Sequence, residues 1–469
     1  MMKYHPSAIA GAIALLLSCS GAVHAQSVTA LEQVAKDGSL GVNSTIPNGW
    51  GGHQPRIIHH RDGTIHVVYL LNMNGNLYWK ARHRSLSGNW TDDSAPVQTF
   101  DDVSLLLNQQ NDNAYVVAWP NSIPTLYNLS NPGTPVVISG HWPNNPQNYR
   151  QYENTGIASD GTLCLKVAYE APTSPIPTSQ VNTEYSCAAF DTGTQSYQWN
   201  DTIQSHYIGL RYVYDYLHIN PPLHPPGMYG VAKRDLLYSA SNIPNSSSTY
   251  VKNALRSYVA DLSNAGIWTQ NDYVKEIPGP APDPNNPNAK VVPPEAINQD
   301  VLIDHLGRQF VAYNITNPIP GTSTGSFLYV SDPSGNLIQQ GPWPGAAIDA
   351  WGLRRFYEDD QGRLWLVWIN AGNRAPEVKV YPIIENNNSF SLGTPVDLSS
   401  SFGQIVPDTQ QGYSFYLAAP RGGNARYPNI DILFNACGSI SYKDNTAIPL
   451  SQCYANAPQL VYYVSIALP

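Results

Sequence analysis

The chain has 469 residues, of which only 13% are Asp, Glu, Lys or Arg, and its formal net charge is −9. This acidic balance argues against a nucleic-acid partner, because nucleic-acid binding requires a basic surface that displaces counterions. The 39 prolines, 35 glycines and 30 tyrosines suit turns and strands better than helix interiors, so the composition disfavours a helix-rich fold.

Residues 1–25 have the pattern of an export signal. Lys3 gives a positive start, the apolar segment Ala8 to Leu17 is too short to span a bilayer, and Val23-His24-Ala25 places small residues at the cleavage position. We therefore expect a signal peptide followed by one mature domain over residues 26–469. The signal predicts a secreted or periplasmic protein.

Membrane attachment has one alternative route. Leu16-Leu17-Ser18-Cys19 loosely resembles a lipidation box, which leaves lipoprotein anchoring open. No later stretch approaches the ~20 apolar residues that a membrane helix needs, so we expect no membrane span.

One sequence motif, which we call the repeat phrase, recurs along the mature chain: a polar or glycine turn is followed by an apolar run that ends near an aromatic residue. The seven copies are Arg61–Tyr69, Asn111–Trp119, Asp160–Tyr169, Tyr229–Tyr238, Asp304–Tyr313, Asp360–Trp368 and Gln411–Leu417. Asp-Gly tolerates the positive φ of a tight turn, and each run after the turn reads as a buried inner strand. The spacing of about 50 to 70 residues is that of a four-stranded blade. The sequence predicts an all-β, seven-bladed propeller, with a β-sandwich or two unrelated β domains as the alternative.

Four cysteines follow the signal segment, and four cysteines allow three pairings. We favour Cys164–Cys187 and Cys437–Cys453, because each pair lies within one local strand–turn–strand stretch. A metal site is a weaker interpretation, since neither pair has the tight spacing of a zinc motif.

His53 is the first candidate for chemistry. It follows Gly51-Gly52, which permits close substrate approach, and it directly precedes the first strand of the first blade. A histidine there can act as a general acid or base near neutral pH. A structural or solvent-exposed histidine is the alternative, and we expect His59, His60 and His66 to be structural.

The fourth repeat carries a second group of candidates. Alternation along the segment 211–218 places Tyr212, Tyr214 and Tyr216 on one side of a strand and Arg211 on the other. A phenol beside a guanidinium can pass a proton, and a guanidinium can hold a carboxylate in a fork. Arg234 arrives on the next strand and could supply that partner. Plain sheet packing of the tyrosines is equally open.

A third group, Trp351, Arg354 and Arg355, stands at the entrance to the sixth blade. Paired arginines beside an aromatic ring suit a sugar acid, because the sugar ring stacks on the aromatic side chain and the carboxylate meets the guanidinium. A surface loop with two solvated charges is the alternative. The sequence shows no nucleophile elbow, HExxH, P-loop or EF-hand motif.

The segment His53 to Lys80, with His-Gln-Pro-Arg, Asp-Gly-Thr-Ile-His-Val-Val-Tyr and Asn-Leu-Tyr-Trp-Lys, resembles the opening of propeller-type polysaccharide lyases. Those are the ulvan lyases and rhamnose–glucuronate lyases, with their rhamnosidase-like relatives. The tyrosine-rich strand followed by Arg234 is similar to the tyrosine and arginine of those lyases. The resemblance in architecture covers the mature chain, and the specific motifs cover about a tenth of it.

The resemblance implies β-elimination at a uronic acid. His53 and Tyr214 (or Tyr212) would share the base and acid roles, and Arg234 would neutralise the carboxylate, because charge builds up on an already anionic group. Those families often carry a second histidine about 20 residues after the first. Asn72 aligns with it here, with Asn74 nearby, and an amide can hydrogen-bond a carboxylate but cannot carry a proton.

Two other functions stay open: a rhamnosidase-like glycoside hydrolase on the same scaffold, and a non-catalytic glycan-binding propeller. In each case the expected partner is an acidic polysaccharide or oligosaccharide, bound by a monomer. We expect no cofactor in catalysis, and the sequence leaves a structural metal ion open.

Overall fold

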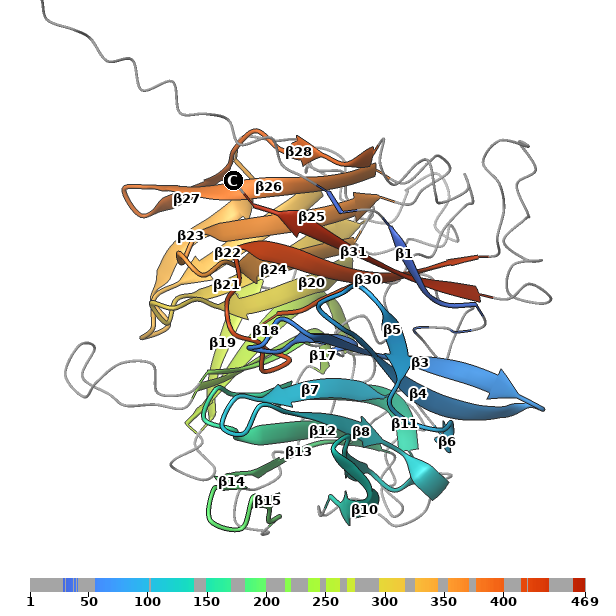
Figure 1. Ribbon diagram of the computed structural model, residues 1–469. Helices are drawn as coiled ribbons and strands as arrows, with labels where there is room; N and C mark the ends of the chain where they lie inside the picture. The colour runs from blue at the N-terminus through green and yellow to red at the C-terminus, as the bar shows by residue number, and fades with distance from the viewer. Residues whose placement is uncertain are drawn as a thin grey trace, which may run out of the picture.

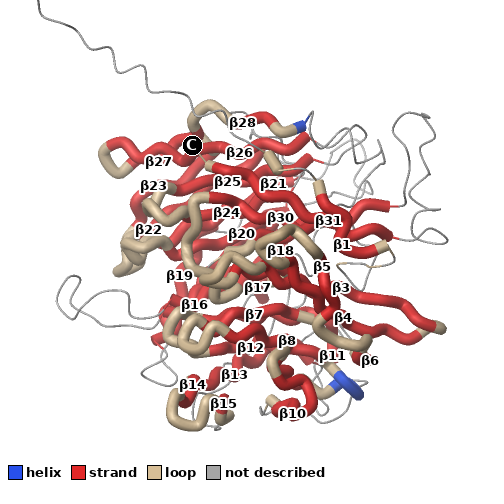
Figure 2. Tube along the Cα trace, in the orientation of Figure 1, coloured by secondary structure: helices blue, strands red, loops and turns tan. Residues whose placement is uncertain are grey.

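The computed structural model describes residues 28–29, 31–36, 38, 40, 55–100, 103–138, 149–169, 182–199, 216–220, 235–244, 250–261, 268–274, 295–316, 325–344, 353–370, 377–399, 415–419, 421–437 and 459–468. These residues form an all-β propeller in which antiparallel sheets are arranged around a common centre (Figure 1). Strands dominate the described chain (Figure 2), and a short 3-10 helix, η1 (Pro120–Ser122), follows the second sheet's β8.

The sheets are meanders whose strands follow one another in chain order. The first contains β2 (Ile57–His59), β3 (Ile65–Met73), β4 (Asn76–Arg84) and β5 (Trp90–Asp92), with β6 (Val97–Gln98) paired to β4. The second contains β7 (Ser104–Asn108), β8 (Asn113–Ala118), β9 (Thr125–Asn128) and β10 (Asn131–Val137). The third contains β11 (Tyr149–Ile157), β12 (Leu163–Tyr169) and β13 (Asn182–Ala188), followed by a separate pair, β14 (Phe190–Asp191) and β15 (Ser196–Tyr197).

The later sheets repeat this plan. The fourth contains β16 (Tyr216–Asn220), β17 (Asp235–Pro244), β18 (Tyr250–Asp261) and β19 (Trp268–Val274). The fifth contains β20 (Glu295–Ile303), β21 (Gln309–Thr316), β22 (Gly325–Ser331) and β23 (Leu337–Pro342). The sixth contains β24 (Leu353–Glu358), β25 (Leu364–Asn370), β26 (Glu377–Asn386) and β27 (Ser389–Leu392), with β28 (Val396–Asp397) paired to β26.

The last sheet joins the two ends of the chain. It contains β29 (Phe415–Leu417), β30 (Asn429–Cys437), β31 (Gln459–Ala467) and β1 (Glu32–Ala35), and β1 pairs with β31 in the register Glu32↔Tyr463 (Figure 1). The side chain of Glu32 also accepts hydrogen bonds from Arg84 and Trp90 of the first sheet. Pairing of strands from distant parts of the chain in one sheet closes the ring of blades.

The predicted propeller is confirmed, but the predicted count of seven four-stranded blades is met only in part. Among the described residues, six sheets have four or five strands, whereas the third in chain order has three, with β14 and β15 as a separate ladder. Phe190 of β14 and Tyr197 of β15 nevertheless pack in the same apolar layer as Leu163 of β12 and Leu106 of β7.

The hydrophobic core lies between neighbouring sheets. Ile58, Val68 and Trp79 of the first sheet are buried against Leu105 and Val116 of the second. Comparable layers separate the fifth sheet from the sixth and the sixth from the last. Alternating side chains of each strand therefore face opposite sheets, and this explains why the second strands read as nearly continuous apolar runs.

The Asp-Gly phrases form the turns that they predict. The run after each turn is predicted to be the inner strand, but it is the second strand of its sheet. In the first sheet β2 precedes the turn, and Gly63 takes a φ of +88° and donates its N–H to His60 O. The last phrase, Gln411–Leu417, is also corrected: it ends in the first strand β29, whereas the second strand is β30. The predicted Cys164–Cys187 disulfide is present, where β12 opposes β13. The Cys437–Cys453 pair lies partly outside the described residues.

Candidate functional site

The first strands of the sheets run in the same direction around the centre. Leu105 N donates to Pro55 O, and Arg61 farther along donates to Gln109 O. The same order recurs between the fifth and sixth sheets, where Arg355 donates to Gln299 O. The ring therefore has two distinct ends. We call the end at which the first strands begin the entry end, and the end at which they turn back into the second strands the turn end.

Most of the predicted site residues lie outside the described residues: His53, Arg211, Tyr212, Tyr214, Arg234 and Trp351. The strands beside them still constrain the chain. β16 begins at Tyr216, and β17 begins at Asp235, which is paired with Asn220 at the far end of β16. The chain therefore enters β16 and β17 at opposite ends of this sheet.

Asn72 is described and lies near the tip of the β3–β4 hairpin. Its side-chain Oδ1 accepts a hydrogen bond from Gly75 N at 3.1 Å, and the residue is exposed. Because β3 is antiparallel to β2, this hairpin projects at the entry end, where the chain enters β2. Asn72 therefore lies at the entry end, where β2 begins. The candidate general base His53 comes shortly before β2 in the sequence.

Arg354 and Arg355 are not the solvated surface charges that the sequence left as an alternative. They are 0% and 1% exposed, and both belong to β24 at the centre of the ring. Arg355 lies over the Phe415 ring, 5.4 Å from its centroid, and its Nη1 donates to Gln299 O at 2.9 Å. Both side chains therefore lie in the interior at the centre of the ring and are not exposed on the described surface.

The turn end is filled by residues 421–428, which connect β29 to β30 and which we call the crossing segment. Arg421 O accepts from Ile157 N at 3.0 Å, and Gly422 O accepts from Leu107 N at 2.7 Å. On the other side of the centre, Arg421 Nη1 lies 2.8 Å from Asp300 Oδ1. The segment therefore touches the first strands of several sheets and closes the ring centre at the turn end.

Gly423 is required by the closeness of this contact. A Cβ added there would lie 1.8 Å from Leu107 O, and the residue has a φ of +85°. Side-chain-bearing residues are excluded by both the space and the conformation. The neighbouring Asn424 is buried, and its Oδ1 accepts from His59 N at 2.6 Å.

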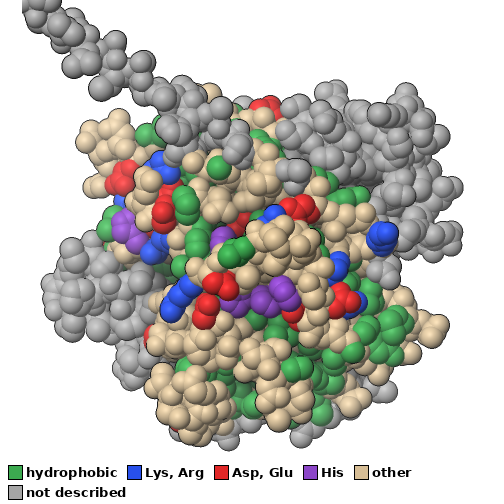
Figure 3. All heavy atoms as spheres, viewed as in Figure 1, with side chains coloured by type: hydrophobic (Ala, Val, Ile, Leu, Met, Phe, Trp, Pro, Cys, Tyr) green, Lys and Arg blue, Asp and Glu red, His purple; other side chains and the backbone are tan. Residues whose placement is uncertain are grey.

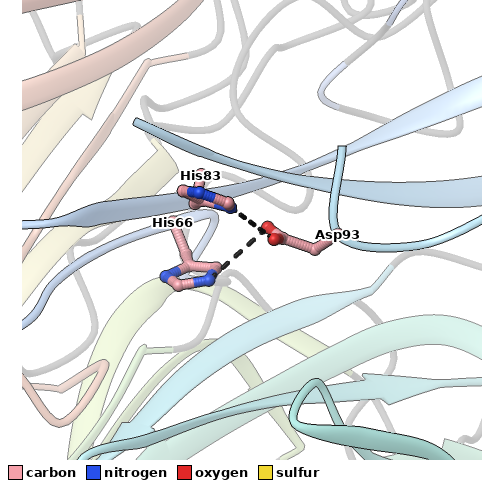
Figure 4. Close-up of side chains that lie close together, drawn as sticks. All are labelled: His66, His83 and Asp93. Carbon is pink, nitrogen blue, oxygen red and sulfur yellow. Dashed lines mark hydrogen bonds and ion pairs between the residues drawn. The ribbon is translucent and has the colours of Figure 1, made fainter. Parts of the chain in front are cut away.

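A cluster of imidazoles and carboxylates lies beside the crossing segment at the turn end. His66 of β3 and His83 of β4 are directly opposed in the strand register, and both point toward Asp93, just after β5 (Figure 4). His83 Nδ1 is 2.5 Å from Asp93 Oδ1, and His66 Nε2 is 3.4 Å from Asp93 Oδ2. His60 packs against His66 with ring centroids 4.6 Å apart.

Burial sets the charge state of this cluster. It lowers the pKa of His66 to about 3, helped by the neighbouring His60 and His83, and it also lowers the pKa of His60 despite the attraction of Asp112. Burial raises the pKa of Asp93, although the hydrogen bond with His83 opposes that shift. Near neutral pH the cluster therefore holds neutral imidazole at His66 and His60.

Further histidine–carboxylate pairs occupy the same end, and Figure 3 shows histidine side chains gathered across the middle of the face with acidic and basic neighbours. His59 Nδ1 lies 2.7 Å from Asp431 Oδ2, and its ring stacks on Tyr427 at 3.9 Å. His305 Nδ1 lies 2.5 Å from Glu358 Oε1, and Glu358 Oε2 forms an ion pair with Arg426 of the crossing segment. These pairs fasten the crossing segment to the first and sixth sheets.

Sequence reasoning treated His66 as structural and did not single out His83 or Asp93. A signal existed, because His66 and His83 are equidistant from the Asn74-Gly75 turn and must oppose each other in a hairpin. The position of Asp93 depends on how β5 returns along β4 and carries no comparable signal.

No protein-family model matches the sequence, and no curated protein matches it significantly. Among solved structures, the polysaccharide lyase Uly1 aligns with a TM-score of 0.55 at 8% identity, covering 94% of this chain and 100% of that one. A PL25 ulvan lyase bound to -[GlcA(1-4)Rha3S]- aligns with a TM-score of 0.49 at 9% identity, covering 92% and 95%. The α-L-arabinofuranosidase Arb93A from Fusarium graminearum aligns at 0.41 and 11% identity, covering 93% and 98%.

The resemblance to propeller-type lyases is therefore present in the fold. At such low identity the alignment with Uly1 establishes a shared architecture over nearly the whole chain, and fold alone does not assign an activity. No helix within the described residues is long and apolar enough to cross a membrane.

Proposed function

We propose that this protein is an exported polysaccharide lyase that cleaves a uronic-acid-containing polysaccharide by β-elimination. The observation that carries the proposal is the fold shared with a polysaccharide lyase over nearly the whole chain. The lyase-like residues between His53 and Lys80 and the tyrosine-rich segment before β16 support it from the sequence. The disulfide between Cys164 and Cys187 fits an exported protein, since such bonds persist in oxidising compartments.

The substrate would bind at the entry end. The crossing segment fills the ring centre at the turn end, and Asn72 projects at the entry end. The chain also enters β2 and β16 there, directly after His53 and after Tyr212 and Tyr214 in sequence. Ligands of propellers are held where several first strands converge, so residues distant in sequence can share one pocket.

In the proposed reaction a basic group removes the C5 proton of the uronate, and the C4–O bond breaks to leave an unsaturated sugar. His53 and Tyr214, or Tyr212, share the base and acid roles. A cationic group must neutralise the carboxylate, because the intermediate carries additional negative charge. Asn72 can hydrogen-bond that carboxylate without carrying a proton.

The strand register bears on which arginine neutralises the substrate carboxylate. Arg234 directly precedes β17, which starts at the turn end, whereas Arg211 precedes β16, which starts at the entry end. The register therefore favours Arg211 as the carboxylate partner. Trp351, which precedes β24 by the same topology, is the proposed stacking surface for a sugar ring.

The seventh blade is part of the same proposal. First strands contact one another in the sequence β2–β7–β11–β16–β20–β24, and β29 contacts β2. Seven first strands around one centre support seven blades, with β11, β12 and β13 as the core of the incomplete one.

The test is incubation of the mature protein with a panel of glucuronate-containing polysaccharides. A lyase produces the ultraviolet absorbance of an unsaturated uronate together with new reducing ends. New reducing ends without that absorbance would identify a glycoside hydrolase, and retarded migration in a polymer-containing gel without cleavage would identify a binding protein. His53→Ala and Tyr214→Phe should each abolish turnover with the melting temperature unchanged.

A further inference from the structure

The geometry points to a transition-metal site of the zinc class at the turn end, formed by His66, His83 and Asp93. Each residue offers one ligand atom, and the three atoms all lie within 4.8 Å of one another. The site is separate from the proposed sugar-binding end, because β3 carries Asn72 at one of its ends and His66 at the other.

The donor set fits this class of metal. Two imidazole nitrogens and one carboxylate oxygen form the three-ligand protein set of tetrahedral zinc sites whose fourth position is taken by water. Bonds of about 2.0–2.2 Å to a tetrahedral ion bring ligand atoms to about 3.4 Å apart. His66 Nε2 and Asp93 Oδ2 are already 3.4 Å apart, and the closer His83–Asp93 pair needs only a small rotation to open.

Atoms without hydrogen bonds mark the place of the ion. Within the described residues, Asp93 Oδ2 is buried and makes no hydrogen bond, although it faces His66. Buried polar atoms are almost always satisfied, so such an atom in a native structure calls for a bound partner. A cation between Asp93 and the two imidazoles supplies that partner.

The backbone holds the ligands in place without the ion. His66 and His83 face each other across the β3–β4 pair, and Asp93 N donates to Ala81 O at 3.0 Å. Ser94 Oγ then accepts from Ala81 N at 3.1 Å. The backbone that carries Asp93 is therefore held against β4 at Ala81, two residues before His83, as a preorganised site requires.

A second imidazole–carboxylate unit flanks the three ligands. His60 Nδ1 lies 3.5 Å from Asp112 Oδ1, and His60 Nε2 is buried with no hydrogen bond within the described part of the chain. His60, in the β2–β3 turn of the first sheet and packed on His66, connects the site to Asp112, which lies between β7 and β8 of the second sheet.

The site would hold the strands of the first blade together, next to the sheet that closes the ring. Its ligands come from β3, from β4 and from the residue after β5, and Arg84 next to His83 binds Glu32 of β1. An ion here ties the hairpin and the returning strand together beside the pairing that closes the propeller. Its role is therefore to stabilise the fold, independently of catalysis at the entry end.

The test uses tag-free mature protein, stripped with a chelator and titrated with Zn²⁺ and Co²⁺. The inference predicts one equivalent bound, a visible Co²⁺ spectrum of low-symmetry coordination with nitrogen ligands, and a higher melting temperature with Zn²⁺. His83→Gln and Asp93→Asn should each weaken metal binding by more than about 10-fold, because the loss of an outer-shell partner alone typically weakens it by about 10- to 100-fold.

His305→Gln is the matched control, because His305 also pairs with a carboxylate at the turn end yet stands outside the three ligands. It should leave stoichiometry and affinity unchanged. Wild-type protein that binds no Co²⁺ and gains no thermal stability with Zn²⁺ would overturn the inference, whatever the variants do. So would binding that persists in His83→Gln and Asp93→Asn but is lost in His305→Gln.

Discussion

Asp300 of β20 and Arg421 of the crossing segment form an ion pair across the centre of the propeller, with 2.8 Å between Oδ1 and Nη1. Asp300 is 1% exposed, and its other oxygen accepts a hydrogen bond from Phe356 N. One carboxylate therefore joins the fifth sheet to the sixth and also to the segment that closes the turn end. This contact makes the centre of the ring a structural element at the turn end.

Removing the cation of this pair should destabilise the fold strongly. Arg421→Met leaves the buried carboxylate of Asp300 without its partner, and breaking a buried ion pair in this way costs about 3–5 kcal/mol. The free energy of unfolding from urea titration measures the loss. Asp300→Asn combined with Arg421→Met should recover part of it, because no charge is left uncompensated. Equal stability of wild type and Arg421→Met would show that the pair does not hold the crossing segment.

The crossing segment should not tolerate a side chain at its closest approach. Gly423→Ala places a Cβ against Leu107 O and strains a positive φ, so we expect a loss of stability well beyond the roughly 1 kcal/mol of conformational strain. Gly75→Ala is the matched control, since Gly75 has a φ of +80° but no atom within 4 Å of its added Cβ. Similar melting temperatures for the two variants would mean that the contact with Leu107 is looser than described.

Acid should destabilise the metal-free protein through His66. Its pKa in the folded protein is lowered to about 3 from 6.5, so below pH 6.5 the unfolded chain binds a proton that the folded protein does not. Stability is therefore full above pH 6.5 and falls as the pH drops toward 3, by at most about 1.4 kcal/mol per pH unit from this group.

His66→Gln removes that group, so its unfolding free energy in the presence of a chelator should fall less steeply with acid than that of the wild type. Above pH 6.5 the two proteins should show parallel pH dependence, which serves as the internal control. Parallel curves throughout the acid range would show that His66 is not held neutral by burial.

The disulfide of the third sheet should contribute measurably to stability. Cys164 and Cys187 are opposed in the β12–β13 register, and the bond closes a loop with a sequence separation of 23. Cross-linking a loop of this length restricts the unfolded chain, so Cys164→Ala with Cys187→Ala should cost about 3 kcal/mol. Peptide mapping without reductant checks the bond itself, and free thiols at both positions would contradict it.

The sequence predicts the sheets well where the pattern is local. The Asp62-Gly63 turn and the apolar run after it depend only on backbone φ and on alternation, so the hairpin β2–β3 follows from neighbouring residues. The same holds for the disulfide, whose two cysteines lie on adjacent strands.

The centre of the ring cannot be predicted in that way. The sequence suggests Arg354 and Arg355 as ligands of a sugar acid or as solvated charges, because the contacts that bury them, such as the one with Gln299 O, come from another sheet. Residues 421–428 contain glycine, asparagine and arginine, which are common in loops. Their role appears only once ring closure brings Gly422 beside Leu107 and Ile157.

The measurement that tests the account most directly compares wild type, Arg211→Ala and Arg234→Ala on one glucuronate-containing polysaccharide that the wild type degrades. The account predicts unsaturated uronate from the wild type, little from Arg211→Ala, and near-normal rates from Arg234→Ala. Reducing ends without unsaturated sugar from the wild type would contradict β-elimination itself. Loss of turnover in Arg234→Ala alone would contradict the placement of the carboxylate partner at the entry end.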